Sequence, residues 1–395
     1  MKEAYLDNAA TTPVLTEVLE AMLPYLGDAY GNPQSLHDWG DEAREAIEDA
    51  RGKVATLIGG KLEEIIFTGS GTEANNFAIK GLAQAQQSKG KHVVISAIEH
   101  FSVLHSARTL EKWGFEVTQV PVDGHGLVDP EAVAKSIRED TILVSVMHAN
   151  GEVGTMEPIA EIAEAVKKTG ALFHTDAVAA VGTIPVDIKE LGVDALSLAA
   201  NQFYGPKGVG ALWLRKGTRI IPILDGGVQE GGRRGGTENV PAIVGMGKAA
   251  ELAQQDMSSR IERISKLRDQ LIGGVTSCVE HTLLTGHPTN RLLGNASFCI
   301  EFIEGEAMLM LLASKGIAAS SGSACTSRAL KASHVLTAMG IPPEIAQGSL
   351  LFSLGLNNSE ADVDDLLEVL PPIVDRLRQM SPLYAKFLKQ QGGGK

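Results

Sequence analysis

The fold is decided by residues 194–214, whose sequence is DALSLAANQFYGPKGVGALWL. The apolar run at 194–200 predicts a β-strand that enters this stretch, and the run at 209–214 predicts a strand that leaves it. Glycine and proline at 205–208 interrupt regular structure between the two runs. The stretch therefore predicts a strand, a tight break and a second strand.

Strand-like and helix-like segments alternate in the residues that precede this stretch. Strands are expected at 65–68, 92–96, 116–120, 141–147 and 171–174, and helices at 72–87, 103–113, 130–138 and 159–168. Strands that alternate with helices of this length indicate parallel strands in a doubly wound α/β domain.

The rhythm changes after a long helix expected at 241–272. Strands at 295–302 and 349–354, with helices at 305–314 and 359–380, predict a smaller α+β unit. We therefore expect a large α/β domain formed by residues 14–255. Residues 1–13 and 256–395 are expected to form a small α+β domain.

Composition excludes several classes of partner. The chain has 395 residues and a formal net charge of −13, which argues against binding to nucleic acid, because such binding needs a basic surface. No apolar run approaches the length of a membrane span, and the first residues, MKEAY, predict no signal peptide. Three scattered cysteines fit a reducing compartment, so we expect a cytoplasmic protein.

The segment 67–76, FTGSGTEANN, predicts a strand, a turn of small residues and the start of a helix. Free backbone N–H groups there, together with the Thr72 hydroxyl, suit an anion such as phosphate. The alternative is a tight turn with Thr72 as the helix N-cap, and this segment by itself favours the alternative.

Two polar residues follow predicted strands at one edge of the sheet. Asp176 lies in the segment HTDA (174–177), at the carboxyl end of the strand expected at 171–174, and α/β folds bind ligands at this end of their strands. Its carboxylate suits a protonated pyridinium nitrogen. A helix N-cap is the alternative role. His100 follows the strand at 92–96 and suits stacking on a ring, although lone loop histidines are commonly solvent-exposed.

The segment 320–327, SSGSACTS, places Cys325 among small residues. Such surroundings suit an accessible thiolate nucleophile, whereas an inert loop thiol is the alternative. Cys299 lies between Phe298 and Ile300 and, like Cys278, is expected to be inert.

Taken together, these stretches resemble the cysteine desulfurases of the NifS/IscS type, within the class V aminotransferase group. The resemblance extends from Tyr5 to about Leu370. It is also carried by YGNP (30–33), HANGEVG (148–154), GGVQE (226–230), GTENV (236–240) and SHVL (333–336).

The resemblance implies a fold-type-I pyridoxal-phosphate (PLP) architecture like that of aspartate aminotransferase. Such a fold has a large α/β domain with a mixed or parallel sheet, a smaller α+β C-terminal domain, and a homodimeric assembly. Members convert L-cysteine to L-alanine, hold the sulfur as a persulfide on a loop cysteine, and pass it to an iron–sulfur scaffold protein or another acceptor.

The resemblance also assigns residue roles. Cys325 corresponds to the persulfide cysteine. The positions that correspond to cofactor-binding residues are Gly71 and Thr72 in the phosphate turn, His100 on the ring, Asn150 at a polar contact, Asp176 at the pyridinium nitrogen, and Thr237, which contacts the phosphate across the dimer.

Other positions depart from the family pattern. The family's Ser-Gly-His-Lys corresponds to residues 199–202, so Gln202 replaces the lysine that attaches the cofactor. An amide nitrogen cannot form that imine, because its lone pair is delocalised into the carbonyl. Ala199 and Asn201 replace two phosphate contacts, Ala179 replaces a glutamine beside the cofactor hydroxyl, and Leu351 replaces the arginine that binds the substrate carboxylate. At about 1.5–3 kcal/mol for each charge-assisted hydrogen bond, the two lost phosphate contacts weaken PLP about 10²–10⁴-fold.

Two hypotheses follow from these departures. In the first, the protein is a desulfurase that uses PLP without covalent attachment. In the second, it is a catalytically degenerate homologue, and Cys325 carries a persulfide or contributes one ligand to an iron–sulfur cluster. The cluster would be shared with a scaffold partner, because one thiolate cannot hold a cluster. A transaminase would need the missing lysine too. The joint loss of imine, phosphate and carboxylate contacts favours the second hypothesis.

Overall fold

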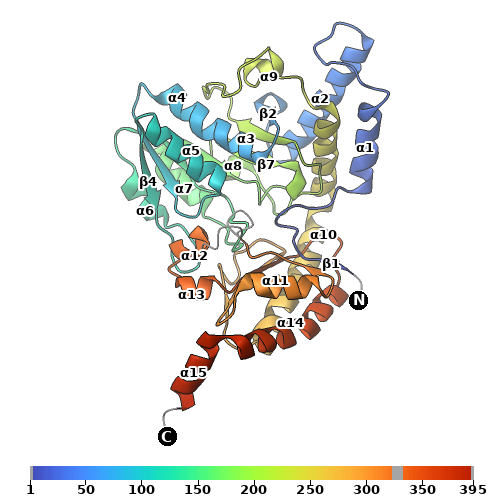
Figure 1. The fold of residues 1–395 in the computed structure, drawn as a ribbon. Coiled ribbons are helices and arrows are strands. Elements are labelled where there is room, and N and C mark those ends of the chain that lie inside the picture. The colour runs from blue at the N-terminus through green and yellow to red at the C-terminus, as the bar shows by residue number, and fades with distance from the viewer. Residues whose placement is uncertain (1–2, 323–331, 393–395) are drawn as a thin grey trace.

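The computed structural model describes residues 3–322 and 332–392 (Figure 1). A seven-stranded sheet has the order β2-β8-β7-β6-β5-β3-β4. In that order the strands are β2 (Ile65–Thr68), β8 (Gly210–Leu214), β7 (Ala195–Ala199), β6 (Leu172–Asp176), β5 (Thr141–Ser145), β3 (His92–Ser96) and β4 (Glu116–Val120). The sheet is mixed and mostly parallel, as expected.

Strand β8 is the exception, because it pairs antiparallel with both β2 and β7. Residues 200–209 join β7 to β8, and this connection is too short for the crossover of about a dozen or more residues that a parallel pair needs. The stretch that decides the fold therefore inserts one reversed strand into a sheet whose other neighbouring pairs are parallel.

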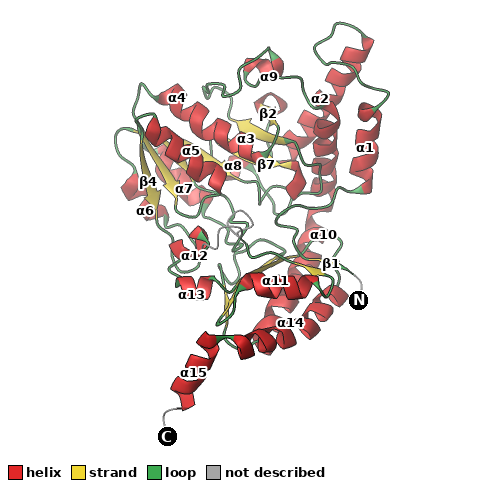
Figure 2. Cartoon of the chain, viewed as in Figure 1, coloured by secondary structure: helices red, strands yellow, loops and turns green. Residues whose placement is uncertain are grey.

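Alternate residues of the strands are buried on opposite faces of the large sheet. Ile65 and Phe67 of β2 join the cluster that helices α2, α7 and α10 complete, whereas Ile66 joins the cluster of the α3–α5 side. Figure 2 shows the sheet between these helices. The helices in this part of the chain are α1 (Thr16–Leu26), α2 (Asp38–Leu57), α3 (Gly71–Asn76), α4 (Leu82–Gln86), α5 (Phe101–Lys112), α6 (Pro130–Ser136), α7 (Ile159–Lys167), α8 (Ile188–Leu191) and α9 (Gln229–Gly232). Short helical turns lie at Leu62–Glu64, Phe77–Gly81 and Ala200–Gln202.

A smaller unit follows along the 39-residue helix α10 (Val240–Cys278). Its antiparallel sheet has the order β12-β10-β9, with β9 (Thr282–Leu284), β10 (Asn295–Ile300) and β12 (Ser349–Ser353). Near the N-terminus, β1 (Ala4–Tyr5) pairs with β11 (Ile317–Ala318), so the first residues join this unit. The remaining helices are α11 (Gly305–Ala313), α12 (His334–Ala338), α13 (Pro343–Ala346), α14 (Glu360–Met380) and α15 (Pro382–Gly392). The expected domain boundary at 255/256 falls inside α10 and stays a prediction.

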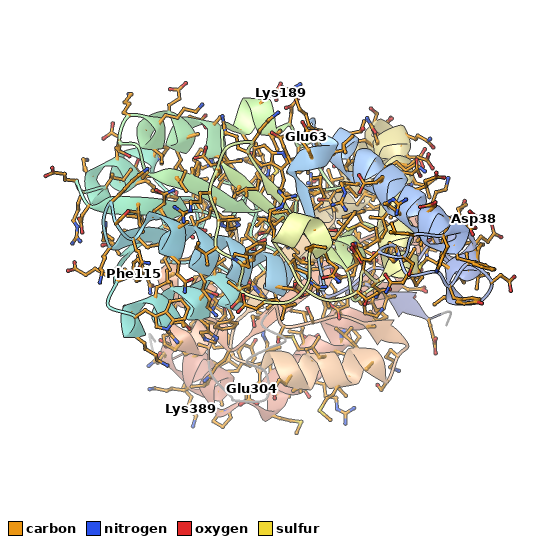
Figure 3. The ribbon with its side chains drawn as sticks, turned by 90° about the horizontal axis from the view of Figure 1, so that it is seen from above. Asp38, Glu63, Phe115, Lys189, Glu304 and Lys389 are labelled. Carbon is orange, nitrogen blue, oxygen red and sulfur yellow. The ribbon has the colours of Figure 1, made fainter. Side chains whose placement is uncertain are left out.

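Charged side chains from distant parts of the chain lie at the rim of the molecule. Asp38, Lys189 and Lys389 mark this rim in Figure 3. Among the described residues, none of the helices combines the length and apolar character that crossing a membrane requires.

Candidate functional site

A cavity of about 440 Å³ lies beyond the carboxyl ends of strands β2, β3, β5, β6 and β7, and we call it the main cavity. Its volume is in the range of about 300–1,000 Å³ that is typical of small-molecule sites. Five of the six predicted cofactor-binding residues line it, namely Gly71, Thr72, His100, Asn150 and Asp176. Thr237 is exposed and is not part of this lining.

Asp176 ends strand β6 and is almost fully buried. Its Oδ2 accepts a hydrogen bond of 2.6 Å from Asn75 Nδ2, and its Oδ1 accepts one of 3.0 Å from the backbone N–H of Val178. Burial raises the pKa of the Asp176 carboxyl, although nearby His100 and both hydrogen bonds act in the opposite direction. No helix begins directly after Asp176 in the described chain, so the alternative role of helix N-cap does not apply, and the two hydrogen bonds hold the side chain at the edge of the cavity.

A chain of hydrogen bonds joins Asp176 to His100. Asn75 Nδ2 also donates to Ser102 Oγ at 2.8 Å, and this hydroxyl lies 2.7 Å from His100 Nδ1. The same ring nitrogen accepts a hydrogen bond from the backbone N–H of Ser102, so His100 caps helix α5. Asp176 and His100 are thus positioned together by residues that sequence analysis did not single out.

The turn before α3 has a different cap from the one considered above. Ser70 is the N-cap, and its Oγ accepts from the backbone N–H of Glu73, so the assignment of Thr72 as the cap is wrong. Thr72 is exposed at the cavity. A Cβ atom on Gly71 would lie 2.7 Å from Val178 Cγ2, so only glycine fits without movement.

Asn150 is buried, and its amide is used within the protein. Its Oδ1 accepts from the backbone N–H groups of Glu152 and Val153, and its Nδ2 donates to the Ile98 carbonyl at 3.0 Å. These bonds stabilise the loop after β5. Most of the polar capacity of this side chain is therefore committed, and its contact with a ligand stays a prediction.

All five positions at which the sequence analysis expects a departure from the family pattern line the main cavity, namely Ala179, Ala199, Asn201, Gln202 and Leu351. Gln202 Nε2 donates a hydrogen bond of 3.1 Å to the Ala9 carbonyl, which ties it to the N-terminal segment. Among the described residues, the lining includes neither lysine nor arginine. An anionic ligand consequently meets no fixed cation from this part of the chain.

The main cavity instead contains two further carboxyl groups that sequence analysis did not select as site residues. Glu99 accepts from Ser96 Oγ and the Met147 backbone N–H through Oε1, and its buried Oε2 has no partner among the described residues. Burial raises the pKa of Glu99 to about 8 and that of Glu152 to about 7. The position of Glu99, just beyond the end of strand β3, is the signal that could have revealed it.

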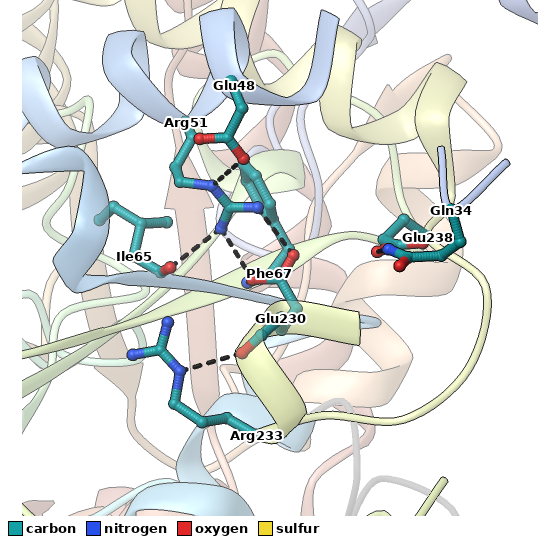
Figure 4. A network of polar contacts seen from close by, with 8 residues as sticks. All are labelled: Gln34, Glu48, Arg51, Ile65, Phe67, Glu230, Arg233 and Glu238. Atoms are coloured by element: carbon teal, nitrogen blue, oxygen red, sulfur yellow. Dashed lines mark hydrogen bonds and ion pairs between the residues drawn. The ribbon is translucent and has the colours of Figure 1, made fainter. Parts of the chain in front are cut away.

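The loop that carries Thr237 is anchored by a buried ion pair (Figure 4). Glu230 adopts a left-handed backbone conformation with φ 49°, and its carboxylate accepts two hydrogen bonds from Arg51, at 2.7 and 2.9 Å. A second ion pair, Arg234 with Glu73, joins this loop to the start of α3 at 2.8 Å. Thr237 lies three residues beyond Arg234 on this anchored loop and is exposed at the surface.

Cys325 lies outside the described residues. Cys299 is buried, and burial raises the pKa of its thiol to about 12, so it stays protonated and inert as expected. Cys278 is exposed, and partial burial raises the pKa of its thiol, so its expected inertness stays a prediction. Within residues 3–322 and 332–392, no group of three or more His, Cys, Asp or Glu side chains is arranged to hold a metal ion.

Comparison with known proteins identifies the family to which this chain is similar. A model of the aminotransferase class V family matches residues 4–366. The chain is 53% identical over 385 residues to "Cysteine desulfurase IscS" of Methanosarcina thermophila, covering 98% of this chain and 95% of the relative. It is 52% identical over 381 residues to the protein of the same name from Dictyoglomus turgidum, covering 96% and 97%. A solved structure titled "NIFS-LIKE PROTEIN" has a TM-score of 0.89 at 39% identity, covering 95% of this chain and 100% of that chain.

The chain therefore belongs to the aminotransferase class V family, and within it to the NifS/IscS-type cysteine desulfurases. Its fold is the fold-type-I architecture of PLP enzymes. The family implies PLP as the cofactor, so the residues of the main cavity can be tested against that group.

PLP fits this cavity at one end only. The buried carboxylate of Asp176 suits the ring nitrogen, and the Asn75–Ser102 chain that supports it is complete. At the other end the lining has the amide of Gln202, and among the described residues it includes no primary amine that could attach the cofactor as an imine. The cavity also holds the two carboxyls with raised pKa values. Among the described residues its lining includes no lysine or arginine to balance a phosphate, only the imidazoles of His100 and His334. The residues therefore do not fit covalently attached PLP.

Proposed function

We propose that this protein takes part in sulfur mobilisation and iron–sulfur cluster assembly without covalently bound PLP, with Cys325 as its functional residue. The observation that carries the proposal is Gln202, which ends the short helical turn after β7, in a cavity lined by no lysine or arginine among the described residues. In this role Cys325 carries a persulfide or contributes one ligand to a cluster completed by a scaffold partner.

The persulfide step needs only thiol chemistry. The Cys325 thiolate attacks the outer sulfur of a donor persulfide, a new S–S bond forms, and the donor leaves as a thiolate. The reverse exchange passes the sulfur to an acceptor. No external oxidant or reductant is required, because one S–S bond breaks as another forms.

The alternative is a desulfurase that acts on L-cysteine with unanchored PLP. It is supported by one observation, since the chain from Asp176 through Asn75 and Ser102 to His100 is complete. In this case Gly71 and Thr72 would bind the phosphate, with Thr237 of a second copy. Asn150 would contact the substrate or cofactor. We propose a homodimer and a cytoplasmic location in both cases, from the family's usual assembly and the composition.

Absorption spectroscopy and product analysis separate the two cases. The purified protein is incubated with PLP and L-cysteine, and bound chromophore, alanine and sulfide are measured. We expect neither alanine nor a retained chromophore after gel filtration. Turnover by the unmodified protein that Cys325→Ala removes would favour the alternative.

A second experiment tests the carrier role directly. The protein is treated with a small-molecule persulfide and its mass is measured after excess donor is removed. We expect one added sulfur that is transferred to an acceptor thiol, lost in Cys325→Ala and kept in Cys278→Ala, which removes the exposed thiol of α10. Equal sulfur loading of Cys325→Ala would refute the assignment of Cys325.

A further inference from the structure

A second, smaller cavity of about 80 Å³ adjoins the main cavity. The two share Ala9, Gly151, Ala179 and Gln202 in their linings. We call it the Arg260 pocket, because the side chain of Arg260 on α10 lines it. Most of its remaining wall is apolar, with contributions from Ile264, Leu292 and Leu293.

Arg260 is a charged group without adequate partners. Its side chain is 4% exposed, and its Nε and Nη1 atoms make no hydrogen bond within the described part of the chain. Its Nη2 lies 3.8 Å from a carboxylate oxygen of Asp256, and this distance is too long for a hydrogen bond. The Asp256 side chain is more than half exposed, so solvent screens its charge. The guanidinium carbon lies 5.6 Å from the centre of the Tyr204 ring, a weak cation–π contact.

The neighbouring arginines on α10 show that this is unusual. Arg263 donates to the carbonyls of Leu356 and Asn358, and Arg268 donates to the Leu292 carbonyl. A buried guanidinium that lacks such acceptors is strongly destabilising unless an anion joins it. Arg260 alone of these three therefore needs an acceptor from outside the described residues.

Other polar groups around the pocket are already paired. Asn295 donates to the carbonyls of Gly151 and Glu152, and Ser353 Oγ accepts from the backbone N–H of Ala9. The guanidinium thus dominates the recognition chemistry of this pocket. A planar carboxylate matches its fork of N–H donors.

We propose that the Arg260 pocket binds the carboxylate of a small organic acid or amino acid. At about 30 Å³ for each water molecule, 80 Å³ corresponds to about two to three waters, which is the size of a carboxylate with a very short apolar chain such as acetate. The Arg260 side chain donates to the carboxylate, and the aliphatic wall contacts the chain. The site is formed independently of the chemistry of Cys325.

Ligand-dependent thermal unfolding of the full chain tests this site. Sodium acetate is the probe, acetamide is its neutral analogue, sodium chloride matches the ionic strength, and L-alanine tests tolerance of an ammonium group. We expect acetate to raise the unfolding temperature saturably, because a ligand bound only to the folded state stabilises it. Acetamide and chloride should have no saturable effect.

Two variants assign any binding to Arg260. Arg260→Met should weaken acetate binding in calorimetric titration by about tenfold or more, the loss expected for a charge-assisted hydrogen bond. Arg260→Lys keeps the charge without the planar fork and should retain weakened binding. Lys135→Gln removes a charge from the exposed face of α6 and should leave binding unchanged.

Three results would overturn the proposal. Equal effects of acetate and acetamide would show that charge is irrelevant, and unchanged acetate binding by Arg260→Met would place the site elsewhere. Saturable binding of sulfate without acetate would replace the carboxylate by a mineral oxyanion. Because the readout is binding, none of these results depends on sulfur transfer.

Discussion

The Arg51–Glu230 pair supports a quantitative prediction about the loop that carries Thr237. Glu230→Ala removes a carboxylate whose side chain is 2% exposed and which accepts two hydrogen bonds from Arg51. It also removes the acceptor of the Phe67 backbone N–H, at 2.9 Å. Burial alone would lower the pKa of Arg51, yet its bonds to Glu230 outweigh that effect and raise it. Glu230 is therefore the principal partner of this cation.

The size of the effect follows from what Arg51 keeps in the variant. Removal of one partner from a buried pair typically destabilises a protein by about 3–5 kcal/mol, because a charge is left uncompensated. Arg51 still donates to the Ile65 carbonyl at 2.9 Å and to Glu48 at 3.0 Å. These remaining acceptors place the expected loss near the lower end, about 3 kcal/mol.

Urea unfolding measures this loss as a lower urea concentration at the midpoint of unfolding, with an unchanged slope of the unfolding free energy against urea concentration. Glu48→Gln is the matched control, because it removes the half-exposed partner of the same guanidinium and should cost about 1 kcal/mol or less. In the double variant Arg51→Met/Glu230→Ala, most of the penalty should vanish, since the unpaired charge is gone. A loss below about 1 kcal/mol for Glu230→Ala would refute the reasoning.

Three further predictions concern the main cavity. The folded state keeps the Glu99 proton to a higher pH than the unfolded state does, so the unmodified protein loses stability as pH rises from about 4.5 to about 8. Glu99→Gln lacks this titration and should gain stability relative to the unmodified protein over that window, by up to about 5 kcal/mol. Urea unfolding at a series of pH values measures the difference. Gly210→Ala should destabilise the fold by about 1–3 kcal/mol in the same assay, because the new Cβ would lie 2.6 Å from the Ser70 carbonyl carbon. Asn75→Ala should lower the free energy of unfolding by about 1–3 kcal/mol, because Asp176 loses a hydrogen bond. The same change should cost less in the background Asp176→Asn, which a double-mutant cycle measures.

Each of these predictions has its own control or contradicting result. A stability difference between Glu99→Gln and the unmodified protein that does not change with pH would show that Glu99 does not titrate in this window. Gly52→Ala, in α2 and with no atom within 4 Å of its new Cβ, should be neutral or stabilising in contrast to Gly210→Ala. Additive effects of the Asn75 and Asp176 changes would contradict their direct coupling.

Much of the large sheet is predictable from the sequence because its strands are short apolar runs bounded by turns. The bounds expected for β2, β3 and β4 agree with the structure, since each run ends at a change in polarity. The reversed direction of β8 is not predictable from the apolar pattern, because apolar runs carry no information about strand direction. Only the short connection from β7 reveals it.

The site is predictable to a smaller extent. Asp176 and His100 were found because they follow strand ends, where α/β folds bind ligands. Glu99 follows the same rule, but its unusual pKa arises from burial, which depends on neighbours distant in the sequence. The Asn75–Ser102 link was not predictable for the same reason, because it joins the start of one helix to the start of another.

Burial has opposite consequences for the carboxyl groups of the main cavity and for Arg260 in the adjoining pocket. With no lysine or arginine in its described lining, the main cavity cannot stabilise buried carboxylates by pairing, so Glu99 and Glu152 gain raised pKa values and lose much of their charge near neutral pH. That adjustment avoids the cost of uncompensated buried anions. Arg260 presents the opposite case in the adjoining pocket, because an arginine cannot shed its proton near neutral pH and so needs an anion. Anion recognition in this chain is therefore expected in the Arg260 pocket, which shares Gln202 with the main cavity, rather than in the main cavity itself.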